Sequence, residues 1–90
     1  MKYKLKMEYN GWTNYATWRV NLEILGDIQF EDKTSADDLK EIVEDVVFSQ
    51  YDGMNSLMYD YASAFISEVN FYEIAENINE ELKLQTEYDN

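Results

Sequence analysis

The chain has 90 residues, a formal net charge of −12, and neither cysteine nor histidine. This length fits one small domain, and the missing side chains exclude disulfides, thiolate metal sites, cysteine nucleophiles and histidine-based general-base chemistry. No apolar run approaches the roughly 20 residues that cross a bilayer, and the lack of cysteine suits a reducing cytoplasm. We therefore expect a single cytoplasmic domain over residues 1–90 that has no cofactor and is not an enzyme.

The charge is distributed unevenly along the chain. Residues 1–19 carry four basic and one acidic side chain, a net charge of +3, whereas residues 20–90 carry three basic and eighteen acidic side chains, a net charge of −15. Such a body is repelled by nucleic acids and anionic membranes and attracted to basic surfaces. Solubility or adaptation to salt explains the same charge without any partner.

Residues 1–9 alternate between apolar and charged side chains, which predicts a half-buried β-strand. The next segment, residues 12–25, fits two structures. As a strand, it pairs with residues 1–9 across a turn at Gly11. As a helix, it has Thr13 as N-cap, Gly26 as C-terminal stop, and one apolar stripe. The members of that stripe are Tyr15, Trp18, Leu22 and Leu25.

The rest of the chain predicts three helices. The first covers about residues 34–50, with Thr34 or Ser35 as N-cap. The second covers about residues 55–69, and the third begins after Asn70 as N-cap. The last six residues, 85–90, are expected to fray. We predict a mainly α fold of about four helices with a short N-terminal β-strand. The alternative is an α+β fold in which a hairpin over residues 2–25 packs on two or three helices.

Acidic side chains follow two of these helices at steps of three or four residues, so each set lies along one helix face. The set on 34–50 is Asp37, Asp38, Glu41, Glu44 and Asp45, and the set on the last helix is Glu73, Glu76, Glu80 and Glu81. A solvated face explains either set alone. The functional interpretation is a surface that imitates a phosphate backbone and binds a basic groove. A carboxylate metal site is less well supported, because chance proximity is expected among 19 acids.

Direct binding of nucleic acid is not expected. The last two helices carry one basic residue between them, Lys83, whereas a recognition helix needs cations for phosphate and base contacts.

Two segments resemble a known family. Asn-Gly-Trp-Thr-Asn-Tyr at 10–15, followed by Thr17 and Trp18, resembles the N-G-W-T-N-Y-x-T-W opening of small proteins encoded by bacteriophages and other mobile elements. Ser-Glu-Val-Asn-Phe-Tyr-Glu-Ile-Ala at 67–75 resembles their second shared stretch, in which Trp is usual at the position of Phe71. Relatives often carry Glu at the position of Ala16, which favours the helical interpretation of residues 12–25. The resemblance implies a phage or mobile-element origin.

Small acidic phage proteins include inhibitors of host nucleases, so the resemblance and the charge together predict an anti-CRISPR or anti-restriction inhibitor that acts as a DNA mimic. Its expected partner is a host protein with a basic nucleic-acid-binding surface. The alternative is an interaction module, or a homodimer, that uses an aromatic face with Trp12 and Tyr15 as anchors. The simpler interpretation of the tryptophans places Trp18 in the core and Trp12 at the start of the helix.

Overall fold

The structure, a computed structural model, describes Tyr9, residues 11–49 and residues 56–89. This part of the chain is helical and contains no strand, which confirms the mainly α interpretation for the described residues. The elements are α2 (Tyr15–Glu23), the 3₁₀ turn η1 (Leu25–Asp27), α3 (Ala36–Phe48), α4 (Ser56–Ser67) and α5 (Phe71–Asp89).

Residues 12–25, which could be a strand or a helix by sequence, contain the helix α2. A turn lies at Gly11, which has φ of 88° and is spanned by a 2.9 Å hydrogen bond from the Trp12 N–H to the Tyr9 carbonyl. The chain then enters α2 instead of a second strand, so the hairpin over residues 2–25 is wrong. The predicted strand over 1–9 lies outside the described residues except for Tyr9, which belongs to this turn.

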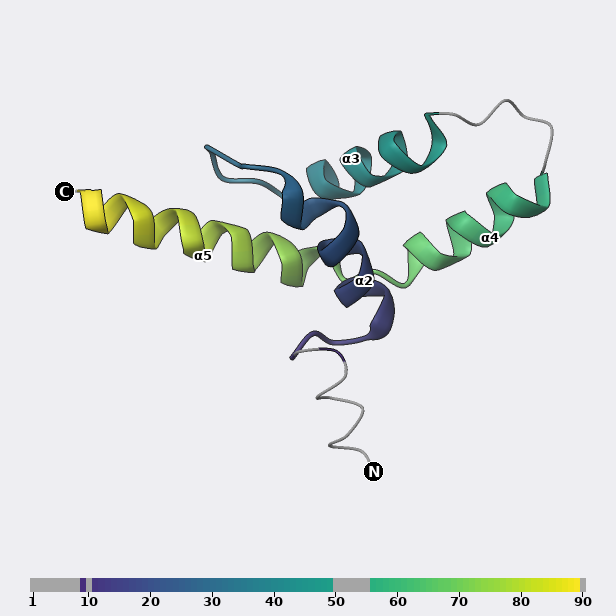
Figure 1. Cartoon of the computed structure of the whole chain (residues 1–90), viewed down its shortest axis with the longest axis horizontal. Helices are drawn as coiled ribbons and strands as arrows, with labels where there is room; N and C mark the ends of the chain where they lie inside the picture. Colours follow the sequence, from purple (N-terminus) through teal and green to yellow (C-terminus); the bar gives the residue numbers. More distant parts are fainter. Residues whose placement is uncertain (1–8, 10, 50–55, 90) are drawn as a thin grey trace.

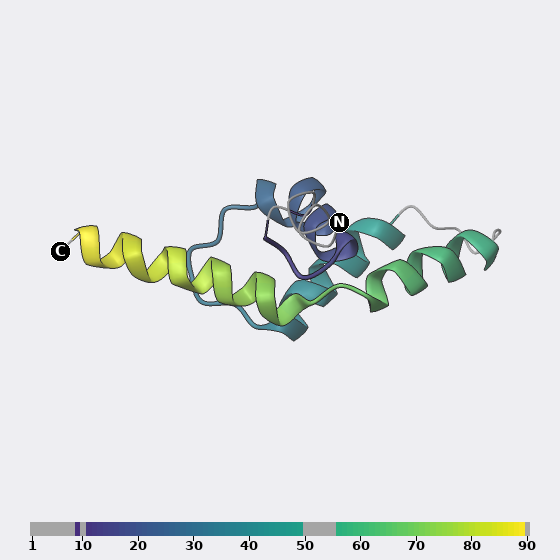
Figure 2. The same ribbon diagram turned by 90° about the horizontal axis from the view of Figure 1, so that it is seen from below.

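The helices form a flat, extended molecule with principal dimensions of 52 × 36 × 18 Å. α2 lies near the centre, and α4 and α5 run outward from it in opposite directions (Figure 1). The view turned by 90° shows the same two arms and the small thickness of the molecule (Figure 2). α3 packs on both α5 and α4, and the Phe48 and Tyr59 rings, 4.7 Å apart, join α3 to α4.

A small apolar core lies where α2, α3 and the start of α5 meet. Its most buried side chains are Leu25, Leu39, Val43 and Ile74, each no more than 2% exposed. Trp12, Phe30, Phe48 and Ile78 are among the half-buried side chains that pack around it. The full set of buried apolar residues is Ala16, Val20, Leu25, Leu39, Val43, Ile66, Val69, Phe71, Ile74 and Ala75.

A buried hydroxyl joins the first helix to the last. Thr17, on α2, is completely buried, and its Oγ1 donates a 2.7 Å hydrogen bond to Asn14 Oδ1 and accepts a 2.8 Å bond from the Asn70 N–H. Asn14 Oδ1 also accepts from the Thr17 N–H, and this bond makes Asn14 the N-cap of α2. The predicted cap, Thr13, is wrong by one residue, because Asn14 Oδ1 accepts both the N–H and the hydroxyl of Thr17.

Further hydrogen bonds reinforce this connection. Asn14 Nδ2 donates to the Glu68 carbonyl at 2.9 Å, and the Thr13 N–H donates to Glu73 Oε1 at 3.1 Å. Asn70 Oδ1 in turn accepts from the Glu73 N–H, which confirms Asn70 as the N-cap of α5. We call this network the polar clasp; its members are Thr13, Asn14, Thr17, Glu68, Asn70 and Glu73.

The polar clasp determines which face of α2 is buried. The buried side chains are Ala16, Thr17 and Val20, whereas Tyr15 and Leu22 of the predicted stripe are exposed. The stripe was therefore predicted wrongly, since a threonine stands at the centre of the true buried face. Trp18 is half-buried and is not among the core side chains, while Trp12 packs against the core.

α3 begins as predicted, with Ser35 as its N-cap. Ser35 Oγ accepts from the Asp38 N–H at 3.1 Å, and Asp37 and Asp38 place negative charge at the positive end of the helix dipole. The preceding residue, Thr34, is held by the Asn79 carboxamide on α5, which bonds both its N–H and its C=O at 3.0 Å. These two bonds fix the start of α3 against α5.

The ends of two helices differ from the sequence-based prediction. α2 ends at Glu23, and Gly26 lies in η1 instead of stopping the helix. A Cβ on Gly26 would lie 2.7 Å from the Asn21 carbonyl oxygen, so this glycine is required by close approach of backbone. α5 continues to Asp89 rather than fraying at residue 85, since no glycine or proline interrupts it.

Replacing Thr17 by valine tests the buried hydroxyl. The shape is kept, but the Asn70 N–H loses its acceptor, so we expect a loss of about 1–3 kcal/mol in the free energy of unfolding, measured by denaturant titration. Thr13→Val is the matched control, because Thr13 is exposed and contributes only its backbone N–H to the polar clasp. Equal stability of the two variants would contradict this role for the hydroxyl.

Gly26→Ala tests the close backbone approach in η1. The added Cβ forces the 3₁₀ turn away from the Asn21 carbonyl, and we expect destabilisation of roughly 1–3 kcal/mol by thermal unfolding. The exposed Ser49→Ala, just after α3, serves as a surface control and should change stability by less than about 1 kcal/mol. An unchanged melting temperature for Gly26→Ala would show that the turn relaxes freely.

Candidate functional site

The acidic row of α3 faces solvent. Leu39 and Val43 are completely buried on one side of the helix, and the acids occupy the opposite side. Glu44 is half-buried; the exposed members are Asp37, Asp38, Glu41 and Asp45. The structure therefore keeps all five predicted acids of this helix on one outward face.

The four predicted acids of α5 lie in different environments. Glu76 and Glu80 are exposed on the side opposite the buried Ile74 and Ala75. Glu73, at the start of the same row, is half-buried and accepts the Thr13 N–H in the polar clasp. Glu81 is exposed to one side, where it lines a groove described below. Because α3 and α5 pack through their buried sides, their acidic rows lie on the outer sides of two separate helices.

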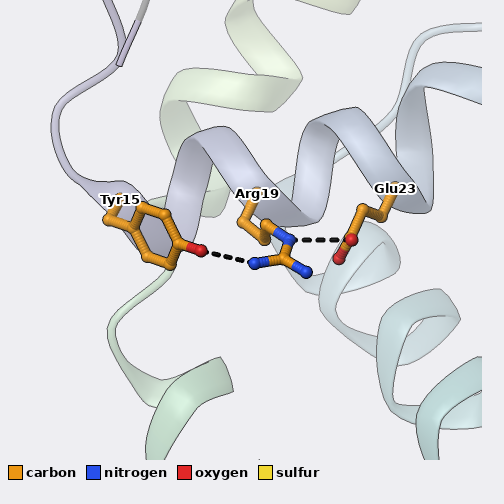
Figure 3. A network of polar contacts seen from close by, with 3 residues as sticks. All are labelled: Tyr15, Arg19 and Glu23. Atoms are coloured by element: carbon orange, nitrogen blue, oxygen red, sulfur yellow. Dashed lines mark hydrogen bonds and ion pairs between the residues drawn. The ribbon is translucent and has the colours of Figure 1, made fainter. Parts of the chain in front are cut away.

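Within the described ranges, one ion pair is formed, between Arg19 Nε and Glu23 Oε2 at 2.7 Å on the surface of α2. Arg19 Nη1 also donates to the Tyr15 hydroxyl (Figure 3). The hydrogen bond to Glu23, and then that to Tyr15, raise the pKa of Arg19, so this guanidinium stays charged. Among the residues that the structure describes, no cation pairs with the acids of α3 and α5 in this way.

Tyr15 is the centre of an aromatic cluster on the surface. Its ring lies 5.6 Å from that of Trp18 and 6.2 Å from those of Tyr9 and Phe65, and it is 43% exposed. Trp12 lies elsewhere, packed on the core beside another hollow of the surface. The structure therefore does not bring the two predicted anchors, Trp12 and Tyr15, into one aromatic face.

An open groove of about 500 Å³ runs between η1, the loop that follows it, and α5. Apolar side chains such as Trp12, Phe30 and Ile78 form part of its wall, and four of its five polar side chains are carboxamides. No cation of the described residues lines it, and one of its polar side chains is an acid, so it is not suited to phosphate. Sequence patterns gave no signal for this groove, because its polar members are scattered over three segments; they are Asn21, Gln29, Asn77, Glu81 and Gln85.

Among the described residues, no group of three or more acidic side chains is placed to hold a metal ion. The same part of the chain contains no helix long and apolar enough to cross a membrane.

Comparisons with known proteins give no family for this chain. No protein-family model matches it, and neither the curated proteins nor the solved structures contain a significant match. We therefore infer the function from the surface of the molecule itself.

Proposed function

We propose that this chain is a small acidic binding protein that occupies a basic, nucleic-acid-binding surface of a partner protein. The observation that carries the proposal is the acidic row of α3, which is outward-facing and has no cation paired with it among the described residues. The mechanism is occlusion: the carboxylates take the place of phosphates, and the nucleic acid can no longer enter. No catalytic group of the chain is needed for this.

The spacing of the charges supports mimicry of a nucleic-acid strand. From Asp37 to Asp45 an α-helix rises about 12 Å, so five carboxylates average roughly one charge per 3 Å. One strand of DNA carries a phosphate about every 3.4 Å along the axis. The two linear charge densities are close. A groove that binds the phosphates of a DNA strand would therefore find carboxylates at a similar spacing on α3.

The position of the acids within α3 also supports a role beyond solubility. Asp37 and Asp38 stabilise the helix at its N-terminus, but Asp45 lies in the last turn, where a negative charge opposes the helix dipole. The last turn has no basic residue to offset this. The fold alone gives no reason for an acid there, whereas a continuous row of charge does.

The resemblance of residues 10–18 and 67–75 to phage proteins suggests that the partner belongs to a host defence system. A phage protein that blocks a basic groove is useful against a CRISPR effector or a restriction enzyme, and we place this chain among such inhibitors, acting in the cytoplasm of the host cell. A competing proposal, a plain interaction module, is favoured by the exposed Tyr15 cluster. The two proposals differ in their salt dependence, because salt weakens contacts between exposed charges but not aromatic ones.

A direct test is retention of bacterial proteins on the immobilised chain, washed at low and then at high salt, followed by competition. A retained nuclease or nucleic-acid-binding protein should elute at high salt, and double-stranded DNA should displace it. A partner that binds DNA and this chain at the same time would contradict mimicry. A partner held through high salt would favour the aromatic module.

Charge reversal on α3 gives the sharper prediction. Glu41→Lys/Asp45→Lys changes two exposed acids of the row, and we expect at least about a tenfold rise in Kd for the partner at low salt, about 1.4 kcal/mol. Glu31→Lys/Asp32→Lys is the matched control, because it makes the same change in net charge in the exposed loop before α3. Equal weakening by both pairs, measured by calorimetry, would mean that net charge alone matters.

A further inference from the structure

α4 has an apolar outer side. Over its 12 residues, Ser56–Ser67, it carries one charged side chain, Asp60. Leu57, Tyr61 and Ala64 follow each other at helical spacing and are all exposed, Leu57 by 58% and Tyr61 by 69%. The buried Ile66 lies on the opposite side of the helix. A helix that is apolar on both sides is typical of one that is covered on both sides.

The apolar surface also includes part of α3. Val46 and Val47, near its end, are 52% and 38% exposed. Between α2, α3 and α4 lies a hollow of about 340 Å³, lined mostly by apolar side chains such as Val47 and Phe65, with the ion pair of Arg19 and Glu23 also in its wall. Phe65 is one turn after Tyr61 on α4, so the outer side of α4 and the hollow are neighbours. We call this surface the α4 patch; it comprises Val46, Val47, Leu57, Tyr61, Ala64 and Phe65.

The molecular surface is larger than that of a compact monomer. The chain has an accessible surface of 7202 Å², against roughly 5,500 Å² for a compact monomer of its mass. Its radius of gyration is 15.0 Å, against roughly 12 Å for a compact domain of this length. Figure 1 shows the two arms, α4 and α5, extending away from the centre, and α4 keeps the apolar side with Leu57 and Tyr61 exposed.

We propose that a second copy of this chain covers the α4 patch, so that the protein is a homodimer through α4. The charge distribution selects this occupant. Two chains of charge −12 repel each other, and a surface whose α4 segment carries a single acid is where they approach at least cost. A basic partner is instead attracted to the acidic row of α3. Depletion of charge at an exposed apolar centre is typical of protein–protein interfaces.

A twofold axis suits this patch because each copy supplies both a protruding and a hollow part. Tyr61 and Leu57 of one copy protrude from α4, and the hollow beside Phe65 can receive an apolar side chain of the other. The acids of α3 lie on the side of that helix opposite its buried residues, and they remain exposed in such a dimer. The dimer is thus independent of the proposed function, and it presents two acidic rows to a partner.

The test is the molar mass in solution, measured by light scattering after size exclusion and by sedimentation equilibrium over a range of concentrations. The unmodified chain should give about twice 10.7 kDa at high concentration. Tyr61→Glu and, separately, Leu57→Glu should shift it to the monomer mass, with helix content unchanged by circular dichroism. Tyr72→Glu is the matched control: Tyr72 is 78% exposed on α5, outside the patch, and the variant adds the same charge.

The outcomes separate this inference from the proposed function. A monomer mass for the unmodified chain at all concentrations overturns the dimer, and so does equal dissociation by Tyr72→Glu and Tyr61→Glu. Added salt should strengthen the dimer, because it screens the repulsion between two negative chains, and weakening of the dimer by salt also contradicts the proposal. Glu41→Lys/Asp45→Lys, which tests the acidic row, should leave dimerisation intact.

Discussion

The hydroxyl of Thr17 is the interaction on which the arrangement of the helices depends. It is completely buried, and it connects the cap of α2 to the backbone at the start of α5, 53 residues away in the sequence. An unpaired hydroxyl in this place would cost free energy, so the Asn14 carboxamide and the backbone N–H of residue 70 are both needed for the threonine to be buried. These two hydrogen bonds fix the rotation of α2 about its axis and the position at which α5 begins.

The polar clasp also explains what the two phage-like segments do. Thr13, Asn14 and Thr17 belong to the first segment, and Glu68, Asn70 and Glu73 belong to the second. The segments meet in space and satisfy each other's polar groups. Polar groups of both segments thus act in a joint between helices, and the acidic row of α3 lies outside both segments.

Much of the helical structure followed from sequence, and the exceptions have a common cause. Ser35 and Asn70 were predictable as caps because their bonds are local, to the N–H three residues on. The buried face of α2 was not predictable, since its central residue, Thr17, is polar and its partner lies on another helix. The apolar stripe predicts Trp18 in the core, but the orientation set by Thr17 leaves it half-buried at the surface. For the site, helical spacing correctly predicts that the α3 acids lie on one face. The hydrogen bond from the Thr13 N–H to Glu73 was not predictable from sequence, because the two residues are 60 positions apart.

The two proposed contacts, of the α3 row with a basic partner and of the α4 patch with a second copy, are expected to respond to salt in opposite ways. The core is small, and a charge of −12 on a flat molecule opposes compaction. In the proposed dimer, burial of the α4 patch adds apolar contact to a molecule with a small core, and dimerisation strengthens as salt screens the repulsion. The proposed binding of a basic partner by the α3 row weakens under the same change. At low salt a basic partner itself neutralises the repulsion, so its binding to α3 and the pairing of α4 should reinforce each other.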